Sequence, residues 1–426
     1  MDTASPSPTP PPVEGAFDRL ARFLGLRRSV VGLLVMVLLL GMGERMAERF
    51  LPLYLQALGG GALTISLFQG MTVLLGAVYS YPSGYLADRL GAKRALLVFN
   101  LLAMAGYLIV IVAPSWPAVF VGAALFLGWT AVSMPATMKL IVRVLPARQR
   151  TMGVSINSLI RRLPMALGPV LGGWFICHWG EHTGIRLAFL AAAVLAGVAI
   201  LVQQRLIEEE PAGPLTSSDT ARFHPLRLLR EMSGPLRMLL LSDILIRFCE
   251  QIPYAFVVVW CMRLIAEPVS AVAFGALTTI EMATAVLVYI PVAYYADRLG
   301  KKPFVLATFV FFTLFPLVLL FCHSFWPLVA AFVLRGLKEF GEPTRKALIV
   351  DLCPADRKAT MFGFYYLIRD LIVAFAAAAG GLLWNLSPAA NLLTAFAVGV
   401  FGTLLFARCG RDVDSTDSSD AQPVRS

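Results

Sequence analysis

The chain has 426 residues, of which 58% are hydrophobic and 15% are charged. That balance excludes a soluble globular protein of this length, because such a protein exposes a larger charged surface. The net charge of +10 does not indicate nucleic-acid binding, because most basic residues lie where a membrane topology would place them.

The chain begins with a predicted disordered and basic cytoplasmic segment, residues 1–28. Its proline-rich run SPSPTPPP, from Ser5 to Pro12, predicts disorder. A short basic stretch suited to the inner membrane surface follows, made of Arg19, Arg22, Arg27 and Arg28. No basic segment followed by an apolar core precedes the first predicted span, so we expect no cleavable signal peptide.

Apolar windows long enough to cross about 30 Å of hydrocarbon recur along almost all of the remaining chain. We predict twelve transmembrane helices, at residues 30–57, 62–87, 93–113, 117–143, 152–178, 187–205, 236–262, 269–296, 303–322, 327–351, 359–385 and 389–407. The predicted domains are an N-terminal six-helix bundle (29–206), a cytoplasmic linker with an amphipathic segment (207–235), a C-terminal six-helix bundle (236–408) and a cytoplasmic tail (409–426). The fold class is therefore an all-α polytopic membrane protein.

The basic residues predict the orientation of these helices. Twenty-three of the 36 Lys and Arg residues lie in or beside the even-to-odd connections and the tails, whereas only Arg186 and Arg263 lie in the odd-to-even loops. Basic loops resist translocation, so we place both termini in the cytoplasm and the chain in a plasma membrane of the bacterial inner-membrane type.

The two halves share a repeated motif. GYLADRLGAKR runs from Gly84 to Arg94, and AYYADRLGKKP runs from Ala293 to Pro303. Further matches recur at offsets of 206 to 209, and they pair Glu44 with Glu250, Arg161 with Arg369, and Gly172–Gly173 with Gly380–Gly381. Such a duplication predicts two pseudo-symmetric bundles with a substrate site between them near the membrane midplane.

The repeated turn and the twelve spans resemble the major facilitator superfamily (MFS) of transporters, over residues 30–407. The first copy matches the family's signature turn at Gly84, Leu86, Ala87, Asp88, Arg89, Gly91, Lys93 and Arg94. The second copy is weaker because Ala293 replaces the first glycine. The resemblance implies a cytoplasmic gate that includes Gly84, Asp88, Arg89, Gly91, Arg94, Asp297, Arg298 and Gly300. The alternative is that these residues set only topology and fold.

A second motif lies in the fifth span. The run from Gly168 to Gly173, GPVLGG, resembles the end of a motif of proton-coupled drug exporters. Ser155 and Pro164 stand where that motif has two earlier glycines. Small residues also allow close helix packing in lipid, so the run leaves export and plain packing open.

Charged residues inside the predicted spans carry the functional prediction. Each would cost about 2.5–3.5 kcal/mol or more at the bilayer centre if it faced lipid, so these side chains must face protein or water. They avoid the interiors of spans 3, 6, 9 and 12, and the resemblance implies that every third span faces lipid. Interior bases exceed acids by eleven to eight, which favours an anionic, zwitterionic or polar substrate. The predicted cavity residues are Glu44, Arg45, Glu48, Arg49, Arg161, Arg162, Arg247, Glu250, Arg335, Lys338, Glu339, Glu342, Arg345, Lys346, Arg369 and Asp370.

Some of these charges can instead form a structural network. Along the tenth span, spacings of three and four residues allow the pairs Arg335–Glu339, Lys338–Glu342 and Glu342–Arg345. Such pairs would hold the bundle together or exchange partners between states.

Proton coupling needs a carboxylate that is neutral in one state and ionised in another. An acid beside an arginine stays ionised, and Glu281 has no base on its own helix before Arg298. We therefore predict that Glu281 is the protonation site, with Glu44 and Glu250 next. The alternative is that a cation from another helix pairs with Glu281.

The sequence has no motif of a hydrolase, a metalloprotease or a nucleotide-binding domain, so we expect no enzyme activity, no cofactor and no metal. The function predicted is a secondary active transporter that exports a small organic solute by proton antiport. Proton-coupled uptake of an anionic or zwitterionic metabolite is the main alternative, and a non-transporting membrane sensor is a remote one. The expected partners are the substrate, protons and the lipid bilayer, with no nucleic acid and a monomeric state.

Overall fold

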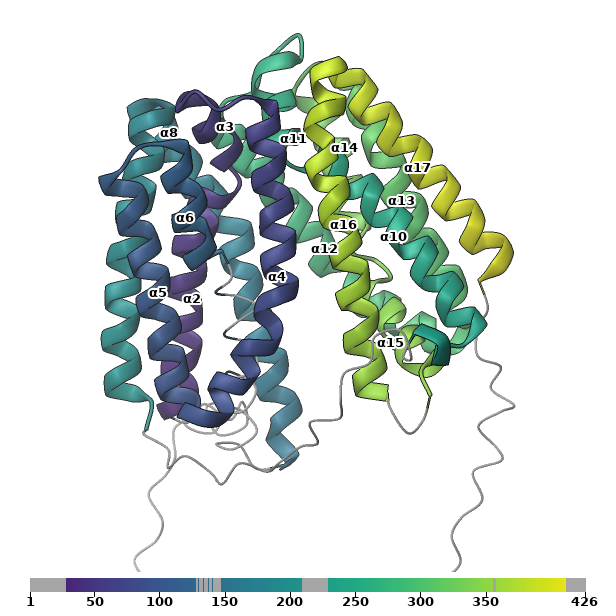
Figure 1. Cartoon of the computed structure of the whole chain (residues 1–426), viewed down its shortest axis with the longest axis horizontal. Coiled ribbons are helices and arrows are strands. Elements are labelled where there is room, and N and C mark those ends of the chain that lie inside the picture. The colour runs from purple at the N-terminus through teal and green to yellow at the C-terminus, as the bar shows by residue number, and fades with distance from the viewer. Residues whose placement is uncertain are drawn as a thin grey trace, which may run out of the picture.

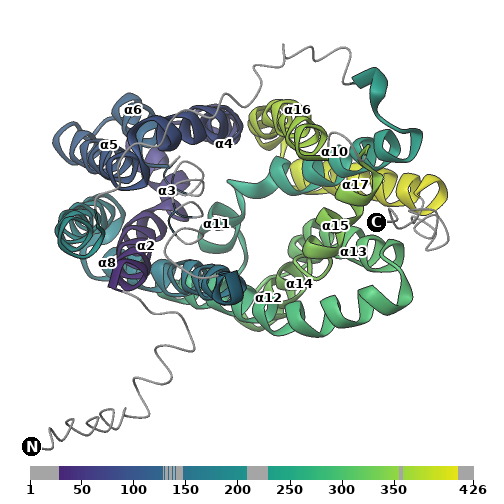
Figure 2. The same cartoon turned by 90° about the horizontal axis from the view of Figure 1, so that it is seen from below.

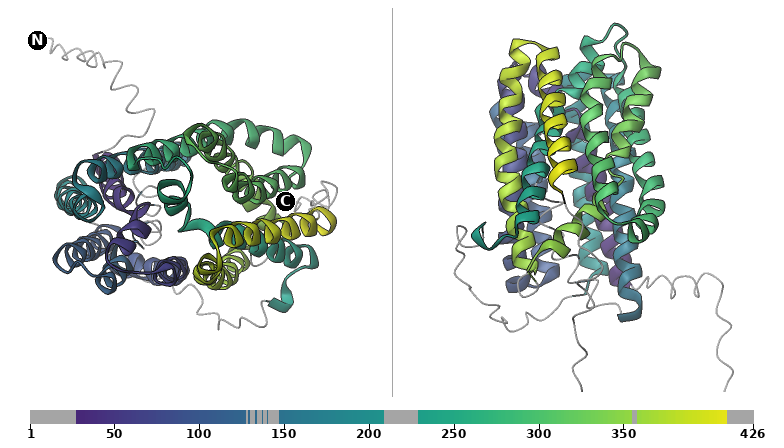
Figure 3. Two further views of the ribbon diagram at one scale, coloured as in Figure 1. Left: turned by 90° about the horizontal axis from the view of Figure 1, so that it is seen from above. Right: turned by 90° about the vertical axis from the view of Figure 1, so that its right-hand side faces the viewer.

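The computed structural model describes residues 28–127, 129, 133, 137, 140, 147–208, 229–354 and 358–410. Every regular element in these residues is helical. The helices form two bundles that stand side by side (Figure 1) and run roughly parallel (Figure 3). The predicted N-terminal segment, most of the linker and the tail lie outside the described residues.

The N-terminal bundle contains α2 (Arg28–Glu48), α3 (Leu51–Ala57), α4 (Ala62–Leu90), α5 (Ala92–Val112), α6 (Trp116–Phe126) and α8 (Ala147–Leu206). The C-terminal bundle contains α10 (Gly234–Tyr254), α11 (Val257–Val259), a π-helical turn (Trp260–Leu264), α12 (Ala271–Leu299), α13 (Lys302–Leu320), α14 (Phe325–Leu337), α15 (Glu342–Leu352), α16 (Lys358–Leu386) and α17 (Pro388–Cys409).

These helices confirm a multi-span membrane protein. Within the described ranges, eight helices are long and apolar enough to cross a membrane, and the bent α10–α11 segment makes a ninth. The label α8 covers the fifth and sixth predicted spans together. They are two helices joined at Gly180, whose non-helical backbone (φ 74°) breaks the helix there. The fourth span is described through α6 and four further positions.

Four glycines with positive φ mark the two ends of the bundles. Gly91 (φ 82°) and Gly300 (φ 87°) lie at equivalent points of the repeat, in the turns that follow α4 and α12. Gly59 and Gly180 form turns at the opposite end. Only glycine adopts this backbone conformation at low cost. We call these ends the Gly91 end and the Gly180 end.

Two seams of small residues join the bundles, α8 against α12 and α4 against α16 (Figure 2). A Cβ added to Gly275 of α12 would lie 2.6 Å from the carbonyl oxygen of Pro169. In the other seam, a Cβ on Gly70 of α4 would lie 3.0 Å from the carbonyl oxygen of Ala374. Both seams lie in the half of the molecule near the Gly180 end, so the bundles meet most closely there.

One glycine of each duplicated pair lies in these seams, and the other packs within its own bundle. Gly173 packs against the backbone of Ala271, and its repeat partner Gly381 packs against Ser66. The GPVLGG run therefore serves close packing between helices, as one of the two readings of the sequence proposed. Its link to export stays a prediction.

Three predicted spans are broken rather than continuous. The first breaks between α2 and α3, the seventh between α10 and α11 with a bend of 43°, and the tenth between α14 and α15. A proline adjoins each break, namely Pro52, Pro253 and Pro343. Proline lacks an N–H donor and clashes with the preceding turn, which explains why the helices end at these points.

Candidate central transport site

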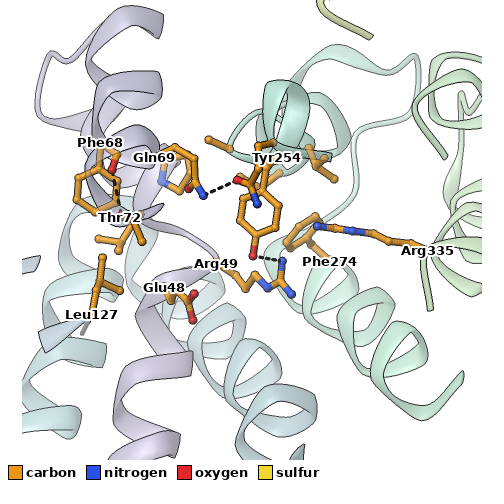
Figure 4. Close-up of a pocket in the computed structure, with 15 residues that line it drawn as sticks. Glu48, Arg49, Phe68, Gln69, Thr72, Leu127, Tyr254, Phe274 and Arg335 are labelled. Carbon is orange, nitrogen blue, oxygen red and sulfur yellow. Dashed lines mark hydrogen bonds between the residues drawn. The ribbon is translucent and has the colours of Figure 1, made fainter. Parts of the chain in front are cut away.

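An internal space lies between the two bundles at the level of the helix breaks. It consists of two cavities of about 150 Å³ and about 220 Å³, which share Arg49, Gln251 and Tyr254 in their walls. Figure 4 shows the first cavity, with Glu48, Gln69 and Thr72 on the N-terminal side. The larger cavity is lined mainly by charged and polar residues, whereas the first has both polar and apolar residues in its walls. Charged groups at membrane depth are costly unless they face protein or water.

Hydrogen bonds cross this cavity from one bundle to the other. Arg49 of α2–α3 donates from Nη1 to the Tyr254 hydroxyl at 3.2 Å, and Gln69 donates from Nε2 to Gln251 Oε1 at 3.0 Å. The guanidinium groups of Arg49 and Arg335 both lie 5.5 Å from the centre of the Tyr254 ring. Any separation of the bundles at this level must break these contacts.

Sequence reasoning missed Gln69, Gln251 and Tyr254 because it searched for charges. Gln251 and Tyr254 follow Glu250 within one helical turn, and a polar residue beside an interior acid was a usable signal. Gln69 is a lone amide in an otherwise apolar span, and nothing in the sequence pairs it with Gln251.

Glu281 of α12 has three cations around it, all from other helices. Its carboxylate oxygens lie 3.4 Å from Arg335 Nε, 3.8 Å from Lys338 Nζ and 4.0 Å from Arg49 Nη2. The side chain is 1% exposed. The predicted lack of a local cation is therefore wrong, and the alternative of a partner from another helix is correct. A pattern along one helix does not reveal what neighbouring helices contribute.

The predicted pairs along the tenth span hold only in part. Glu342 Oε2 pairs with Arg345 at 2.5 Å, as expected. Arg335 reaches Glu281 instead of Glu339, and Lys338 reaches Glu250 at 2.7 Å instead of Glu342. The break at residues 338–341 turns these side chains away from their predicted partners.

The C-terminal bundle holds a continuous ion-pair network. Glu250 accepts from Arg247 at 2.7 Å, and Arg247 also contacts Glu342 at 3.3 Å. Arg345 connects Glu342 to the fully buried Asp243. The remaining members are Arg369 and Asp370, which are 2.7 Å apart, and Lys346, which is half-exposed and 3.4 Å from Glu342.

The N-terminal bundle also holds interior charges. Arg45 pairs with Glu48 on α2, and Glu44 is buried near them. Arg161 donates to Thr137 Oγ1 at 3.3 Å, but its Nε and Nη1 have no partner. Arg162, beside it on α8, is partly buried.

Among the residues of the predicted cytoplasmic gate, the structure describes mainly the glycines. Gly91 and Gly300 adopt the expected turn conformation, and Arg94 is exposed. Gly84 lies within α4, and Asp88, Arg89, Asp297 and Arg298 lie in the last turns of α4 and α12, but these side chains lie outside the description. The gate therefore stays a prediction.

Comparison with known proteins identifies the family. The Major Facilitator Superfamily model matches residues 33–265 and 254–424. The chain belongs to this superfamily. It is therefore a secondary transporter with the MFS fold and not an enzyme, as the sequence predicted.

The relatives fall into uncharacterized transporters and multidrug pumps. An uncharacterized MFS-type transporter of Methanocaldococcus jannaschii is 21% identical over 85% of this chain and 90% of its own length. The multidrug resistance protein MdtH of Edwardsiella ictaluri is 24% identical over 83% of this chain and 86% of its own length. The multidrug efflux pump LfrA of Mycolicibacterium smegmatis is 28% identical, over 42% of this chain and 36% of its own length.

Solved structures of other MFS transporters share the fold. The nucleoside transporter NupG matches with a TM-score of 0.76 and 12% identity, covering 90% of this chain and 100% of that one. A POT family transporter in complex with 5-aminolevulinic acid matches with a TM-score of 0.73 and 13% identity, covering 89% of this chain and 96% of that one. Their substrates do not transfer at this identity.

Proposed function

We propose that this transporter exports a small organic solute by proton antiport, through alternating access at the central cavity. The observation that carries the proposal is the charged cavity between the bundles, bounded by cross-bundle contacts of Arg49 and Gln69. The seams hold the Gly180 end together, so the bundles can rock about the cavity without unfolding either one.

Export is favoured by the names of two relatives. MdtH and LfrA are multidrug efflux proteins, and MdtH matches most of the chain. The excess of basic residues near the Gly91 end supports a cytoplasmic position for that end in a plasma membrane. We further propose that the transporter acts as a monomer, since each chain contains both walls of the cavity.

Uptake by symport is the second candidate, and one observation favours it. Arg161 is an interior cation whose Nε and Nη1 have no hydrogen-bond partner, although the Glu44 carboxylate acts on it electrostatically. A guanidinium group with free donors suits an anionic or zwitterionic substrate better than a cationic drug.

We assign the coupling proton to Glu339. The sequence argument for Glu281 was that a carboxylate without a nearby cation can change its protonation state, and in the structure Glu339 meets that condition better. Glu339 lines the larger cavity, and its carboxylate forms no hydrogen bond or ion pair in the described structure. A carboxylate held by cations stays ionised, whereas one without a partner can bind and release a proton. Glu339 also lies in the break between α14 and α15, and discontinuous helices frame coupling-ion sites in other transporters.

Charged groups from three helices face the cavity that Glu339 borders. The acids and bases concerned are Arg45 and Arg49 of α2–α3, Arg247 and Glu250 of α10, Glu281 of α12, and Lys338 beside Glu339. Each of these acids has a cation partner, so proton uptake by Glu339 leaves their pairs intact.

Transport in proteoliposomes tests this proposal. We would reconstitute the protein with the pH dye pyranine inside, impose a pH gradient of either sign, and follow ethidium and benzoate as cationic and anionic probes. Antiport predicts that each probe moves opposite to the proton gradient, and symport predicts movement along it. No gradient-dependent flux of any member of a wider probe panel would contradict proton-coupled transport.

The Glu339→Gln variant tests the proton assignment. We expect it to keep probe exchange across the bilayer and to lose the acceleration by a pH gradient, because glutamine cannot titrate. Glu267→Gln, an exposed loop change, is the matched control and should behave as the wild type. Full gradient-driven transport by Glu339→Gln would refute the assignment.

A further inference from the structure

The duplication places two clusters at equivalent positions of the two bundles. The Asp243 cluster of the C-terminal bundle consists of Asp243, Arg345, Tyr365 and Arg369. At the offsets that relate the halves, 206 for the first helix and 208 for the others, its N-terminal counterpart consists of Val37, Thr137, Asn157 and Arg161. We call this counterpart the Arg161 cluster.

The Asp243 cluster is a complete anion site. Asp243 is fully buried, and its carboxylate pairs with Arg345. It also accepts a hydrogen bond from the Tyr365 hydroxyl at 3.1 Å and lies 3.3 Å from Arg369 Nη1. Two guanidinium groups and a hydroxyl thus surround one internal carboxylate.

The Arg161 cluster has the donors but not the acid. Val37 stands where the other half has Asp243. Arg161 contacts Thr137 and the ring of Trp129, 5.9 Å away, while its Nε and Nη1 have no partner. Asn157 is fully buried, and neither polar atom of its side chain has a partner. Buried polar groups without partners cost free energy unless a ligand satisfies them.

The packing of α2 against α8 places Val37 in this cluster. A Cβ on Gly41 would lie 2.9 Å from Pro164 Cγ, and a Cβ on Gly168 would lie 2.6 Å from Arg45 Cβ. Both contacts join residues 123 positions apart, and the same register places Val37 beside residue 160, next to Arg161. At the position equivalent to Asp243, the facing helix therefore offers Arg161 the apolar side chain of Val37 instead of an acid.

The cluster adjoins the central cavity. Met165 lies one helical turn from Arg161 on α8 and lines the larger cavity. Because α8 rises from the Gly91 end, Arg161 lies on the Gly91 side of that cavity. Glu44 of α2, seven residues from Val37, acts on Arg161 electrostatically, but Arg161 Nε and Nη1 have no hydrogen-bond partner.

We propose that the Arg161 cluster binds the carboxylate of the transported solute, in the place that Asp243 fills in the other half. The free edge of a guanidinium group suits two parallel hydrogen bonds to a carboxylate, and the Asn157 amide supplies a further donor. The substrate class is then a small organic anion or a zwitterion. This inference rests on the proposed transport function and narrows its substrate.

Thermal unfolding tests carboxylate binding without any transport assay. We would melt the purified protein with benzoate, and with benzamide as an uncharged match of the same shape, at constant ionic strength. A compound that binds the folded state raises its melting temperature. We expect benzoate to raise the melting temperature and benzamide not to do so.

Two variants connect that effect to the cluster. Val37→Asp rebuilds the acid of the other half, so it should raise the melting temperature by itself and abolish the further rise with benzoate. Arg161→Gln should also abolish the benzoate effect, and it should fold because glutamine keeps a donor for Thr137 and removes the buried nitrogens that have no hydrogen-bond partner.

Three results would overturn the inference. The first is that benzoate does not raise the melting temperature of the wild type, and the others are that benzoate still raises it in Val37→Asp or in Arg161→Gln. Absence of flux in proteoliposomes would instead count against the transport proposal, so the two failures are distinguishable.

Discussion

The two bundles carry related charges but use them differently. Arg369 and Arg161 occupy the same position of the duplicated unit, 208 residues apart. Arg369 contacts Asp243 and Asp370, whereas Arg161 has Val37 and Arg162 at the corresponding places, and its Nε and Nη1 have no hydrogen-bond partner. The comparison teaches that an internal acid pairs with buried donors of the C-terminal half, whereas the N-terminal half keeps donors that an external ligand can use.

The largest expected effect comes from breaking the satisfied half. Asp243→Asn removes the buried anion that Arg345 and Arg369 share, although Glu342 and Asp370 remain beside them. Removal of one partner of a buried pair costs about 3–5 kcal/mol. We expect a strongly lowered melting temperature in detergent. Lys346→Gln, which alters a half-exposed partner of Glu342, is the control and should change little. Equal melting of both variants would argue against a structural role for Asp243.

A second prediction concerns the seams rather than the charges. In Gly275→Leu the new side chain meets the backbone of Pro169, and overpacking costs about 1–3 kcal/mol. Because the clash exists only while the Gly180 end is closed, transport should be slowed more than folding is weakened. Gly197→Leu is the matched control, since nothing lies within 4 Å of a Cβ there. Similar transport by the two variants would contradict the seam.

A third prediction sharpens the role of the cross-bundle contacts. Tyr254→Phe removes the acceptor of Arg49 and keeps the ring under both guanidinium groups. A single hydrogen bond contributes about 0.5–1.5 kcal/mol, so probe affinity should change by roughly three- to tenfold. Equilibrium binding of a labelled probe measures this change in affinity. An unchanged affinity would contradict a role of the Tyr254 hydroxyl in the site.

The smallest effect is expected at the surface of the Gly180 end. Arg263 and Glu181 form an ion pair between the bundles, and the Arg263 side chain is 44% exposed. Exposed pairs contribute about 0.2–1 kcal/mol and weaken with salt. Arg263→Gln should therefore slow transport only slightly, and only at low ionic strength. A large loss at high salt would show that the pair is more than an exposed contact.

Much of the fold could be predicted from the sequence. Hydropathy gave the spans, and the two copies of the turn motif predicted the equivalent conformations of Gly91 and Gly300. The broken helices were missed, although Pro52, Pro253 and Pro343 were visible signals. Twenty-residue apolar windows average over such breaks, so hydropathy alone does not detect them.

The site was predicted less completely. Interior charges were found because a membrane makes them conspicuous, and the structure brings Arg49, Glu250, Glu281 and Lys338 to one cavity. Their partners were not predictable, since Glu281 meets Arg335 and Arg49 only through the packing of three helices. Neutral residues such as Gln251 carry no electrostatic signal in the sequence.

The central claim is that the bundles separate and rejoin at the Gly180 end around the shared cavity. A distance measurement between spin labels at positions 181 and 263, in a variant whose six cysteines are replaced by serine, tests it most directly. We predict a short and a long distance, whose populations change with pH and with added benzoate. A single short distance under every condition would contradict the claim.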